Sequence, residues 1–470
     1  MGQAVRIEDF FVDGVWIPSS GQDDLQVFDP SVGRSRGVVR TASAGDVDQA
    51  CAAAARAFPG WSSLHPEQRA AYVAAVGRGL AERAGELADA ITAEVGTPRH
   101  KCVALQVNPA VAAFASAARL GAALQADERI DNTTVRRVPV GVVACITPWN
   151  YPLFQIASKI AAALVAGCTV VLKPSEIAPS CVVHLVEAAS ALPPGVLNVV
   201  FGDGPGTGET LVRHPAVDFV SFTGSTRAGR RIAAVAGEQV KQVSLELGGK
   251  SASIVLPGAD LTTAITKTLA KTFQNSGQTC AALTRLLVPR TDLAQARTAL
   301  NRLVPAFTTG DPTDPTTELG PVTTAAQHEK IVTLTSDARA RGIDLIASGP
   351  ITATPPGYYV PAQAYLTDPN DPLAQEEIFG PILATIPYDN ISEAVSIANN
   401  SPYGLSGSVW ASTPEQAAAV ATQIRTGSVS INGAPTHPDA PFGGFRMSGF
   451  GRERGAHGIL DFLTTQSVHF

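Results

Sequence analysis

Apolar and polar positions along the 470-residue chain alternate between short β-branched runs and stretches of helical spacing. The first forty residues hold short apolar runs between turn sequences such as VDGVW and FDPSVG, which predicts extended hairpin strands. Residues from about 45 to 118 are rich in Ala, Leu, Glu and Arg, with apolar residues three and four apart, which predicts helices. The more polar stretch 121–139 breaks this spacing and predicts a strand pair that leaves the body of the molecule.

From residue 140 the pattern becomes a regular alternation of strand and helix. Apolar, β-branched runs predict buried strands over 140–148, 169–174, 196–202, 217–224 and 242–248, and the intervening stretches predict helices. This alternation indicates a parallel sheet with helices on both faces. A second alternating region begins with a strand at 251–257 and a long helix to about Ser276, and the last residues, FLTTQSVHF, form a strand-like segment.

Length and composition narrow the class of protein. At roughly 150 residues per domain the chain has room for about three units, and 45% hydrophobic with 16% charged residues is typical of a folded globular chain. The net charge of −6, with Lys and Arg spread along the chain, argues against nucleic acid and membrane partners. No secretory signal is visible and the longest apolar stretch, 160–172, is too short to span a bilayer, so we expect a cytoplasmic protein.

The six cysteines form no CxxC pair and no zinc spacing, which predicts reduced thiols and no metal site. Cys280 differs from Cys168 in its surroundings: it follows the polar turn NSGQT, whereas Cys168 lies in the apolar run VAGCTVVL. A lone cysteine is more often inert packing than a nucleophile. Two other residues also have two interpretations. Glu246 in VSLELGG is either a strand-end carboxylate or a general base. Asn150 in TPWNYP is either a turn residue or an oxyanion donor.

Three further segments have the character of nucleotide-binding turns. In FTGSTRAG (222–229) a strand runs into Gly224 and Ser225, where a helix N-terminus can hold a phosphate, although the same residues also cap ordinary helices. LKPSE (172–176) follows a strand, and its Lys and Glu can also be a surface pair. EEIFGP (376–381) can also be a strand end with a Gly-Pro turn.

Taken together, these motifs resemble those of the NAD(P)-dependent aldehyde dehydrogenase superfamily. At least six appear in family order over about residues 10–470, among them the NxGQxCxAxxR pattern (275–285), a glutamate 34 residues before its cysteine, and PFGGFRMSGFGRERG (441–455). The resemblance implies an α/β fold with a Rossmann-type NAD-binding domain (1–120 and 140–247), an α/β catalytic domain (248–455) and a small β oligomerisation element (121–139 and 456–470). A homodimer or homotetramer is expected.

The resemblance also implies the roles of individual residues. Cys280 is the expected nucleophile, Glu246 the general base and Asn150 the oxyanion donor. The expected cofactor-binding residues are Ile146, Trp149, Lys173, Ser175, Glu176, Gly204, Phe222, Gly224, Ser225, Gly229, Leu247, Glu377 and Phe379. A carboxylate at Glu176 beside the adenosine ribose favours NAD, with NADP possible. The chain departs from the family at Arg227, where Glu is usual, and at Arg446, where Lys is usual.

The expected reaction is oxidation of a small-molecule aldehyde to a carboxylic acid through a cysteine thiohemiacetal and thioester. Two alternatives remain open: a CoA-acylating semialdehyde dehydrogenase and a non-catalytic binding protein on the same fold. In the family the aldehyde tunnel lies near Tyr151, Gln155, Ser158, Thr279, Ala281 and the loop before Phe442. Ser158 and Ala281 are small, which indicates room for a bulky aldehyde, and His437 is either a ligand for a polar tail or an exposed loop residue.

Overall fold

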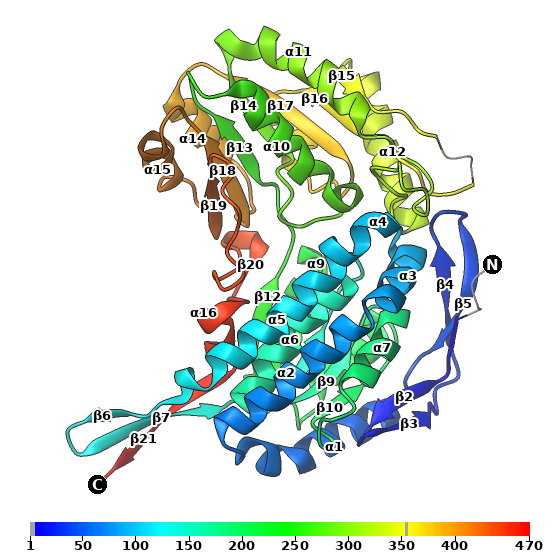
Figure 1. The fold of residues 1–470 in the computed structure, drawn as a ribbon, viewed down its shortest axis with the longest axis vertical. Helices are drawn as coiled ribbons and strands as arrows, with labels where there is room; N and C mark the ends of the chain where they lie inside the picture. Colours follow the sequence, from blue (N-terminus) through cyan, green and yellow to red (C-terminus); the bar gives the residue numbers. More distant parts are fainter. Residues whose placement is uncertain (1–4, 353–355) are drawn as a thin grey trace.

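Four β-sheets organise residues 5–352 and 356–470, the part of the chain that the computed structural model describes (Figure 1). Residues 1–4, at the start of the first predicted segment, lie outside it. The largest sheet is parallel in its centre, from β12 through β11, β8 and β9 to β10, and antiparallel where β20 and β2 join it. Its order is β20 (Gly449–Phe450), β12 (Gln242–Glu246), β11 (Phe219–Thr223), β8 (Val142–Ile146), β9 (Thr169–Lys173), β10 (Leu197–Val199), β2 (Asp9–Val12) and β3 (Val15–Pro18).

Helices cover both faces of this sheet, as the alternation of strand and helix predicts. Val143 and Cys145 of β8 point to one face, into a core shared with α2 (Pro66–Glu82), α3 (Ala84–Val95), α5 (Asn108–Gly121), α6 (Pro152–Ala166) and α7 (Ser180–Ala188). Val142, Ala144 and Ile146 point to the other, into a core shared with α1 (Ala44–Ser62), α8 (Glu209–Arg213) and α9 (Thr226–Gly237). The β8 run is apolar throughout because both of its faces are covered.

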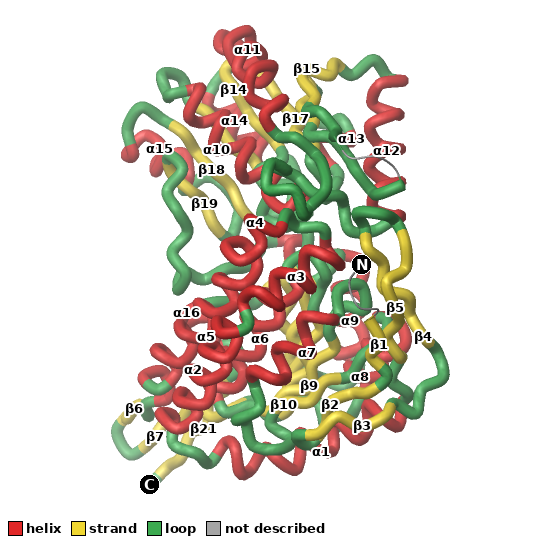
Figure 2. The backbone as a smooth tube through the Cα atoms, turned by 45° about the vertical axis from the view of Figure 1, so that its right-hand side comes forward, coloured by secondary structure: helices red, strands yellow, loops and turns green. Residues whose placement is uncertain are grey.

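A second sheet of seven strands lies beyond the first and is sandwiched in the same way (Figures 1 and 2). Its helices are α10 (Leu261–Phe273) and α11 (Leu293–Leu303) on one face and α14 (Ile391–Asn399) and α15 (Pro414–Ala421) on the other. The strand order is β15 (Asp344–Ser348), β16 (Gln363–Leu366), β17 (Ile382–Tyr388), β14 (Arg285–Pro289), β13 (Ala252–Val255), β18 (Ser406–Trp410) and β19 (Ser428–Ile431). α12 (Ala325–Ala340) and α13 (Pro372–Gln375) complete this part.

A small antiparallel sheet extends away from both of these and carries the C-terminus (Figure 1). It consists of β6 (Glu128–Ile130), β7 (Thr133–Pro139) and β21 (Leu463–His469), so the predicted strand pair at 121–139 and the terminal strand are present and pair with each other. The strand-like interpretation of 456–470 is wrong at its start, because α16 (Gly455–Leu460) is helical there. The role of this sheet in oligomerisation and the division of the chain into domains stay predictions.

Two other differences from the sequence patterns bear on the site. The helix expected to reach Ser276 ends at Phe273, because Asn275 and Ser276 adopt left-handed backbone angles, with φ of 53° and 56°. The glycine-rich segment 441–455, for which no strand was predicted, contains β20, which returns to the first sheet and pairs with β12, Glu246 lying opposite Gly449.

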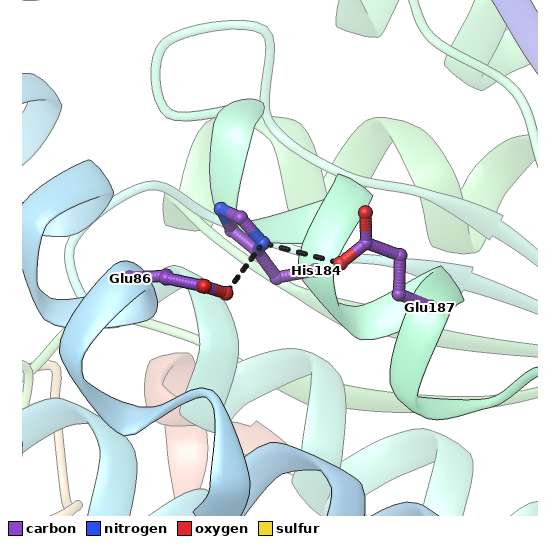
Figure 3. Close-up of side chains that lie close together, drawn as sticks. All are labelled: Glu86, His184 and Glu187. Atoms are coloured by element: carbon purple, nitrogen blue, oxygen red, sulfur yellow. Dashed lines mark hydrogen bonds and ion pairs between the residues drawn. The ribbon is translucent and has the colours of Figure 1, made fainter.

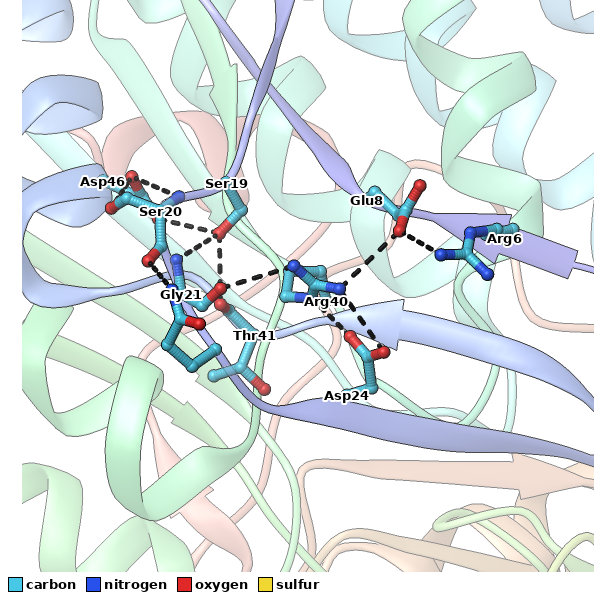
Figure 4. Close-up of polar contacts among 10 residues, drawn as sticks. Arg6, Glu8, Ser19, Ser20, Gly21, Asp24, Arg40, Thr41 and Asp46 are labelled. Carbon is cyan, nitrogen blue, oxygen red and sulfur yellow. Dashed lines mark hydrogen bonds and ion pairs between the residues drawn. The ribbon is translucent and has the colours of Figure 1, made fainter.

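The N-terminal strands are anchored to α1 by a polar network (Figure 4). The strands before α1 include the fourth sheet, which consists of β1 (Val5–Ile7), β5 (Arg34–Arg40) and β4 (Asp24–Asp29). The Asp46 carboxylate accepts hydrogen bonds from the Ser19 and Ser20 hydroxyls, both at 2.8 Å, and from the Ser20 and Ser43 backbone N–H groups. Ser43 also caps α1, so a single carboxylate joins the helix start to the end of the β2–β3 hairpin.

Within residues 5–352 and 356–470, one apolar helical segment has the length and composition of a membrane span. It is Arg99–Gly121, which runs through α4 (Arg99–Cys102), the π-helical turn Val103–Val107 and α5. However, α5 packs between α2 and α6, and Ala110 and Phe114 are fully buried there.

Arg285, the last residue of the NxGQxCxAxxR pattern, has a structural role at the start of β14. Its buried guanidinium donates to the carbonyls of Lys250 (2.8 Å), Ile397 (2.9 Å) and Ala398 (2.8 Å). Burial lowers its pKa to about 10. Arg285, which follows β13 in the chain, therefore ties Lys250, just before β13, to the C-terminal end of α14.

We predict that Arg285→Met lowers the free energy of unfolding by about 3 kcal/mol, since three buried carbonyls lose a charged donor at roughly 1 kcal/mol or more each. Arg290→Met is the matched control, because Arg290 pairs with Asp389 in solvent, where such pairs contribute little. Urea unfolding followed by tryptophan fluorescence measures both. Equal midpoints for the two variants would contradict the structural role.

Candidate active site

The loops that carry Asn150 and Cys280 are joined by hydrogen bonds, although 130 residues separate them. The Asn150 side-chain amide donates to the Gln278 carbonyl at 2.9 Å. The Asn150 backbone carbonyl in turn accepts hydrogen bonds from the side-chain amides of Asn275 (2.8 Å) and Gln106 (3.0 Å). A side-chain amide has two N–H donors. One of these donors of Asn150 is used by the Gln278 carbonyl, two residues before Cys280.

The cysteine loop needs an unusual backbone, and its sequence supplies it. Gly277, with φ of 75°, lies so close to the Gly380 carbonyl that an added Cβ would be 2.1 Å from its oxygen. A Cβ on Gly249 would be 2.5 Å from the carbonyl oxygen of Cys280. The glycines of NSGQTC and ELGGK therefore allow three segments to meet at the cysteine.

Cys280 is half-buried, whereas the other five cysteines are fully buried. Burial raises the pKa of the Cys280 thiol to about 12, and the nearby carboxyl groups of Glu246 and Glu377 act in the same direction. Arg454 acts the opposite way. The resting group at neutral pH is a protonated thiol that a ligand can reach.

Glu246 is the last residue of β12, and its carboxyl group is buried with neither oxygen hydrogen-bonded within the described residues. Burial, followed by repulsion from Glu453, raises its pKa well above the usual value. A carboxyl group without partners in a dry site is costly unless it serves a ligand or water. A Cβ on Gly443 would be 2.8 Å from Glu246 Oε1, so the glycine-rich C-terminal motif packs directly against it.

Sequence reasoning missed a buried ion pair beside Glu246. Lys159 of α6 contacts Glu453 with an Nζ–Oε1 distance of 2.5 Å and also donates to the Ser221 hydroxyl at 3.2 Å. Both charged side chains are buried. Lys159, as the one charged residue of α6, was a signal for it, but its partner is 294 residues away.

The predicted adenosine-side residues lie at the ends of neighbouring parallel strands, where α/β sheets bind ligands. Lys173 ends β9 and contacts Glu176 at 3.2 Å, and the Ser175 hydroxyl accepts from the Ile177 N–H at 3.3 Å. Ile146 ends β8 and is buried in the core. Gly204 begins the short turn after β10, is exposed, and has no atom within 4 Å of an added Cβ. This leaves open space beside the strand ends.

α9 begins directly after β11 with a capped N-terminus. The Ser225 hydroxyl accepts from the Ala228 N–H at 3.2 Å, and Gly224 lies against the ring of Phe222. Gly229 in the first turns of α9 packs on Leu247, where a Cβ would be 2.5 Å from Cδ2. These contacts hold the helix start close to the sheet, in an arrangement that suits a phosphate group.

The third predicted cofactor segment, 376–381, packs against the cysteine loop, where Gly380 faces Gly277. Glu377 Oε1 accepts from the Gly249 N–H at 2.9 Å, and burial raises the pKa of its carboxyl group. Phe379, with φ of 61°, meets Trp149 edge to face with ring centroids 5.6 Å apart. The structure therefore brings Glu377, Phe379 and Trp149 towards the loops around Cys280.

One cluster on the outer helical face has ligand atoms close enough together for a cation (Figure 3). His184 Nδ1 lies 3.5 Å from Glu86 Oε2 and 3.4 Å from Glu187 Oε2. The two carboxylates are exposed, and the residues come from α3 and α7, which contribute nothing to the candidate site. Exposed acidic groups of this kind are common as ion pairs, and we assign no metal to them.

We predict that alkylation of Cys280 by iodoacetamide in the protein alone accelerates about tenfold per pH unit between pH 7 and 10. The thiolate is the reactive form and its pKa is about 12, so its fraction keeps rising over this range. Mass spectrometry of the modified peptide measures the rate, with Cys280→Ala as the background control. A plateau below pH 8 would contradict the raised pKa.

Comparison with known proteins agrees with this geometry. A model of the aldehyde dehydrogenase family matches residues 16–468. The chain is 41% identical over 466 residues to 3-succinoylsemialdehyde-pyridine dehydrogenase of a Pseudomonas species, covering 98% of both chains. Among solved structures, it is 39% identical, with a TM-score of 0.96, to aldehyde dehydrogenase C of Pseudomonas syringae with NAD+ and octanal, over 99% of this chain and 97% of that one.

An NAD+ complex of aldehyde dehydrogenase from Bacillus cereus is also similar, with 31% identity and a TM-score of 0.95 over 99% of this chain and 97% of that one. The likeness in sequence and in fold runs through the whole chain and includes the segments that meet at Cys280. The chain is therefore an enzyme that belongs to the aldehyde dehydrogenase family.

Proposed function

We propose that the protein oxidises an aldehyde to its carboxylic acid, with NAD as the hydride acceptor and Cys280 as the nucleophile. The observation that carries the proposal is the placement of Glu246. Its buried carboxyl group has no hydrogen-bond partner among the described residues. It lies close enough to the half-buried Cys280 to raise the pKa of that thiol. A base beside a thiol suits an enzyme that forms a thioester and then hydrolyses it.

In the proposed cycle the Cys280 thiol gives its proton to water, and its Sγ attacks the carbonyl carbon of the aldehyde. The second N–H of the Asn150 amide, together with the Cys280 backbone N–H, stabilises the resulting oxyanion. Bound NAD supplies the hydride-accepting ring. Once the carbonyl has re-formed as a thioester, Glu246 takes a proton from a water molecule, the water oxygen attacks the acyl carbon, and Cys280 leaves as a thiolate.

The raised pKa of Glu246 fits this role, because a base is most effective when its pKa lies near the working pH. Deacylation should therefore rise with pH through a value above that of an ordinary glutamate. Glu246 also counts against the CoA-acylating alternative, in which CoA and not water takes the acyl group. Acid formation without CoA supports the hydrolytic route.

NADH formation from aliphatic, aromatic and semialdehyde substrates tests the proposal. We expect Cys280→Ala to abolish turnover, while Cys51→Ala, which removes a fully buried thiol from α1, keeps it. We expect Glu246→Gln to release about one equivalent of NADH and then turn over at least 100-fold more slowly, since only deacylation needs the base. Full steady-state turnover in Glu246→Gln, or none in the wild type with any aldehyde, would refute the assignment.

The preference for NAD over NADP rests on Glu176. Its carboxylate lies beside Lys173 at the end of β9, where it would repel a 2′-phosphate. We predict that Glu176→Gln raises the kcat/KM ratio of NADP to NAD about fivefold or more, since like charges about 4 Å apart repel by roughly 1 kcal/mol even in water. Glu187→Gln, on the exposed side of α7, is the control; an equal shift there would point to net charge alone.

The assembly and location of the protein stay predictions. We propose a homodimer or homotetramer because β21 and β6 leave both edges of the small sheet unpaired within the described chain, and exposed edges tend to find partners. A native mass near 48.6 kDa, that of one chain, would argue against it.

The names of the relatives support an aldehyde with a tail of several atoms, since one structure contains octanal and another relative is named for a pyridine semialdehyde. In this chain Tyr151 and Thr279 share a hydrogen bond at 2.8 Å beside the cysteine loop. Ser158, two helical turns along α6 from Tyr151, is small and borders open space.

A further inference from the structure

A closed ring of buried hydrogen bonds lies behind the loop that carries Asn150. The Asn150 backbone carbonyl accepts from the side-chain amides of Gln106 (3.0 Å) and Asn275 (2.8 Å). The Thr97 hydroxyl closes this hydrogen-bond ring, because it donates to Asn275 Oδ1 at 2.7 Å and accepts from Gln106 Nε2 at 3.2 Å. All four residues are buried. Since each comes from a different segment, the ring holds four segments in one arrangement.

The hydrogen-bond ring joins the two loops of the candidate active site to residues outside every motif of the sequence analysis. Asn150 lies just before α6, and Asn275 lies in the loop that leads to Cys280. Thr97 lies between α3 and α4, and Gln106 lies in the π-helical turn before α5. The ring therefore fixes the loop of the proposed oxyanion donor against the loop of the proposed nucleophile.

The π-helical turn explains how Gln106 reaches the ring. Val107, Ala110 and Phe114 are fully buried at steps of three and four residues, as on one face of a regular helix. The preceding buried apolar residue, Cys102, lies five positions before Val107. The extra residue places Gln106 beside the loops while Val107 stays in the helical core. Single π-helical turns are rare and occur frequently at functional sites.

The hydrogen bonds of Gln106 do not suit a residue that serves stability alone. Its Nε2 has two acceptors, but its Oε1 is buried and has no hydrogen-bond partner within residues 5–352 and 356–470. A buried acceptor without a donor costs stability, whereas an apolar side chain of the same shape avoids that cost. The Asn150 carbonyl would also keep Asn275 as a donor. The benefit of the amide therefore lies in the position that it gives Asn150.

We propose that Gln106 is a positioning residue for carbonyl chemistry at Cys280: it fixes the Asn150 peptide so that the Asn150 side chain meets the oxyanion. Thr97 supports it by orienting both Gln106 and Asn275. This assignment rests on the proposed function, which takes Cys280 as the nucleophile. Oxyanion stabilisation needs donors that are in place before charge develops, and a displacement of about 1 Å can cost about 100-fold in rate.

Gln106→Met, which keeps the length of the side chain and removes its donors, tests the assignment. We expect kcat with an aldehyde to fall about 10–100-fold, because an oxyanion forms both when the thiol attacks and when water attacks the thioester. Asn198→Leu is the matched control. Its buried amide also donates to two carbonyls, but it lies in β10 beside the β2–β3 hairpin. An unchanged kcat in Gln106→Met, or an equal fall in Asn198→Leu, would overturn the assignment.

Alkylation of Cys280 separates positioning of Asn150 from general damage to the site. Iodoacetamide reacts with the thiolate by displacement of iodide at a saturated carbon, so no oxyanion forms. Its rate should therefore differ by less than about twofold between Gln106→Met and the wild type. A fall in alkylation that matches the fall in kcat would show that the thiol itself is disturbed, and would count against the positioning role.

Thr97 provides a second set of variants, which also serves if Gln106→Met does not fold. Thr97→Val removes the hydroxyl at nearly constant shape and should lower kcat about threefold or more, because Gln106 and Asn275 each lose a partner. Thr97→Ser keeps the hydroxyl and should restore kcat. Equal kcat values in the valine and serine variants would contradict a role for the hydrogen-bond ring in the reaction.

An activated ester, p-nitrophenyl acetate, tests the positioning role without NAD. The Cys280 Sγ attacks the ester carbonyl through an oxyanion of the same kind, and p-nitrophenolate leaves as the thioester forms. We expect the first equivalent of p-nitrophenolate to appear about 10-fold faster or more from the wild type than from Gln106→Met, with Cys280→Ala as background. That difference supports the role of Gln106 even if no aldehyde is oxidised, in which case the proposed function alone fails. Equal rates, including no release from either protein, would refute it.

Discussion

The buried ion pair between Lys159 and Glu453 is the contact on which the geometry of the site depends. It joins α6, packed under the first sheet, to the last turns of the chain. Burying two charges is costly, and removing either would leave the other without a counter-charge. The pair therefore holds the C-terminal segment in one register. That register places Gly443 against Glu246 and Arg454 beside the open space that Ser158 borders.

The same dry surroundings govern both reacting groups. Burial is the largest cause of the raised pKa of Cys280, which is about 12, and of the raised pKa of Glu246, so the thiol is protonated in the protein alone at neutral pH. A low local dielectric also strengthens the remaining hydrogen-bond donor of Asn150 towards a developing negative charge. The site thus combines a protected resting thiol with strong stabilisation once charge appears.

Much of the fold follows from local sequence, whereas the contacts that complete the site do not. Both helix-covered sheets follow from alternating apolar runs, and the motifs around Asn150, Glu246 and Cys280 were recognisable because each has a distinctive local pattern. The Lys159–Glu453 pair joins segments almost 300 residues apart, and the hydrogen-bond ring at Gln106 joins four separate segments, which no local pattern reveals. α16 was missed because GAHGIL is too short for a helical period to be seen.

The return of the chain at β20 has a consequence for biosynthesis. The strand that completes the edge of the first sheet beside Glu246 is made 200 residues after that glutamate. A nascent chain folds from its N-terminus as it emerges, so most of the nucleotide-type sheet can form early. Glu246 nevertheless stays without its covering wall until the segment around Gly449 has left the ribosome. Nucleophile and base are thus enclosed together only late in synthesis.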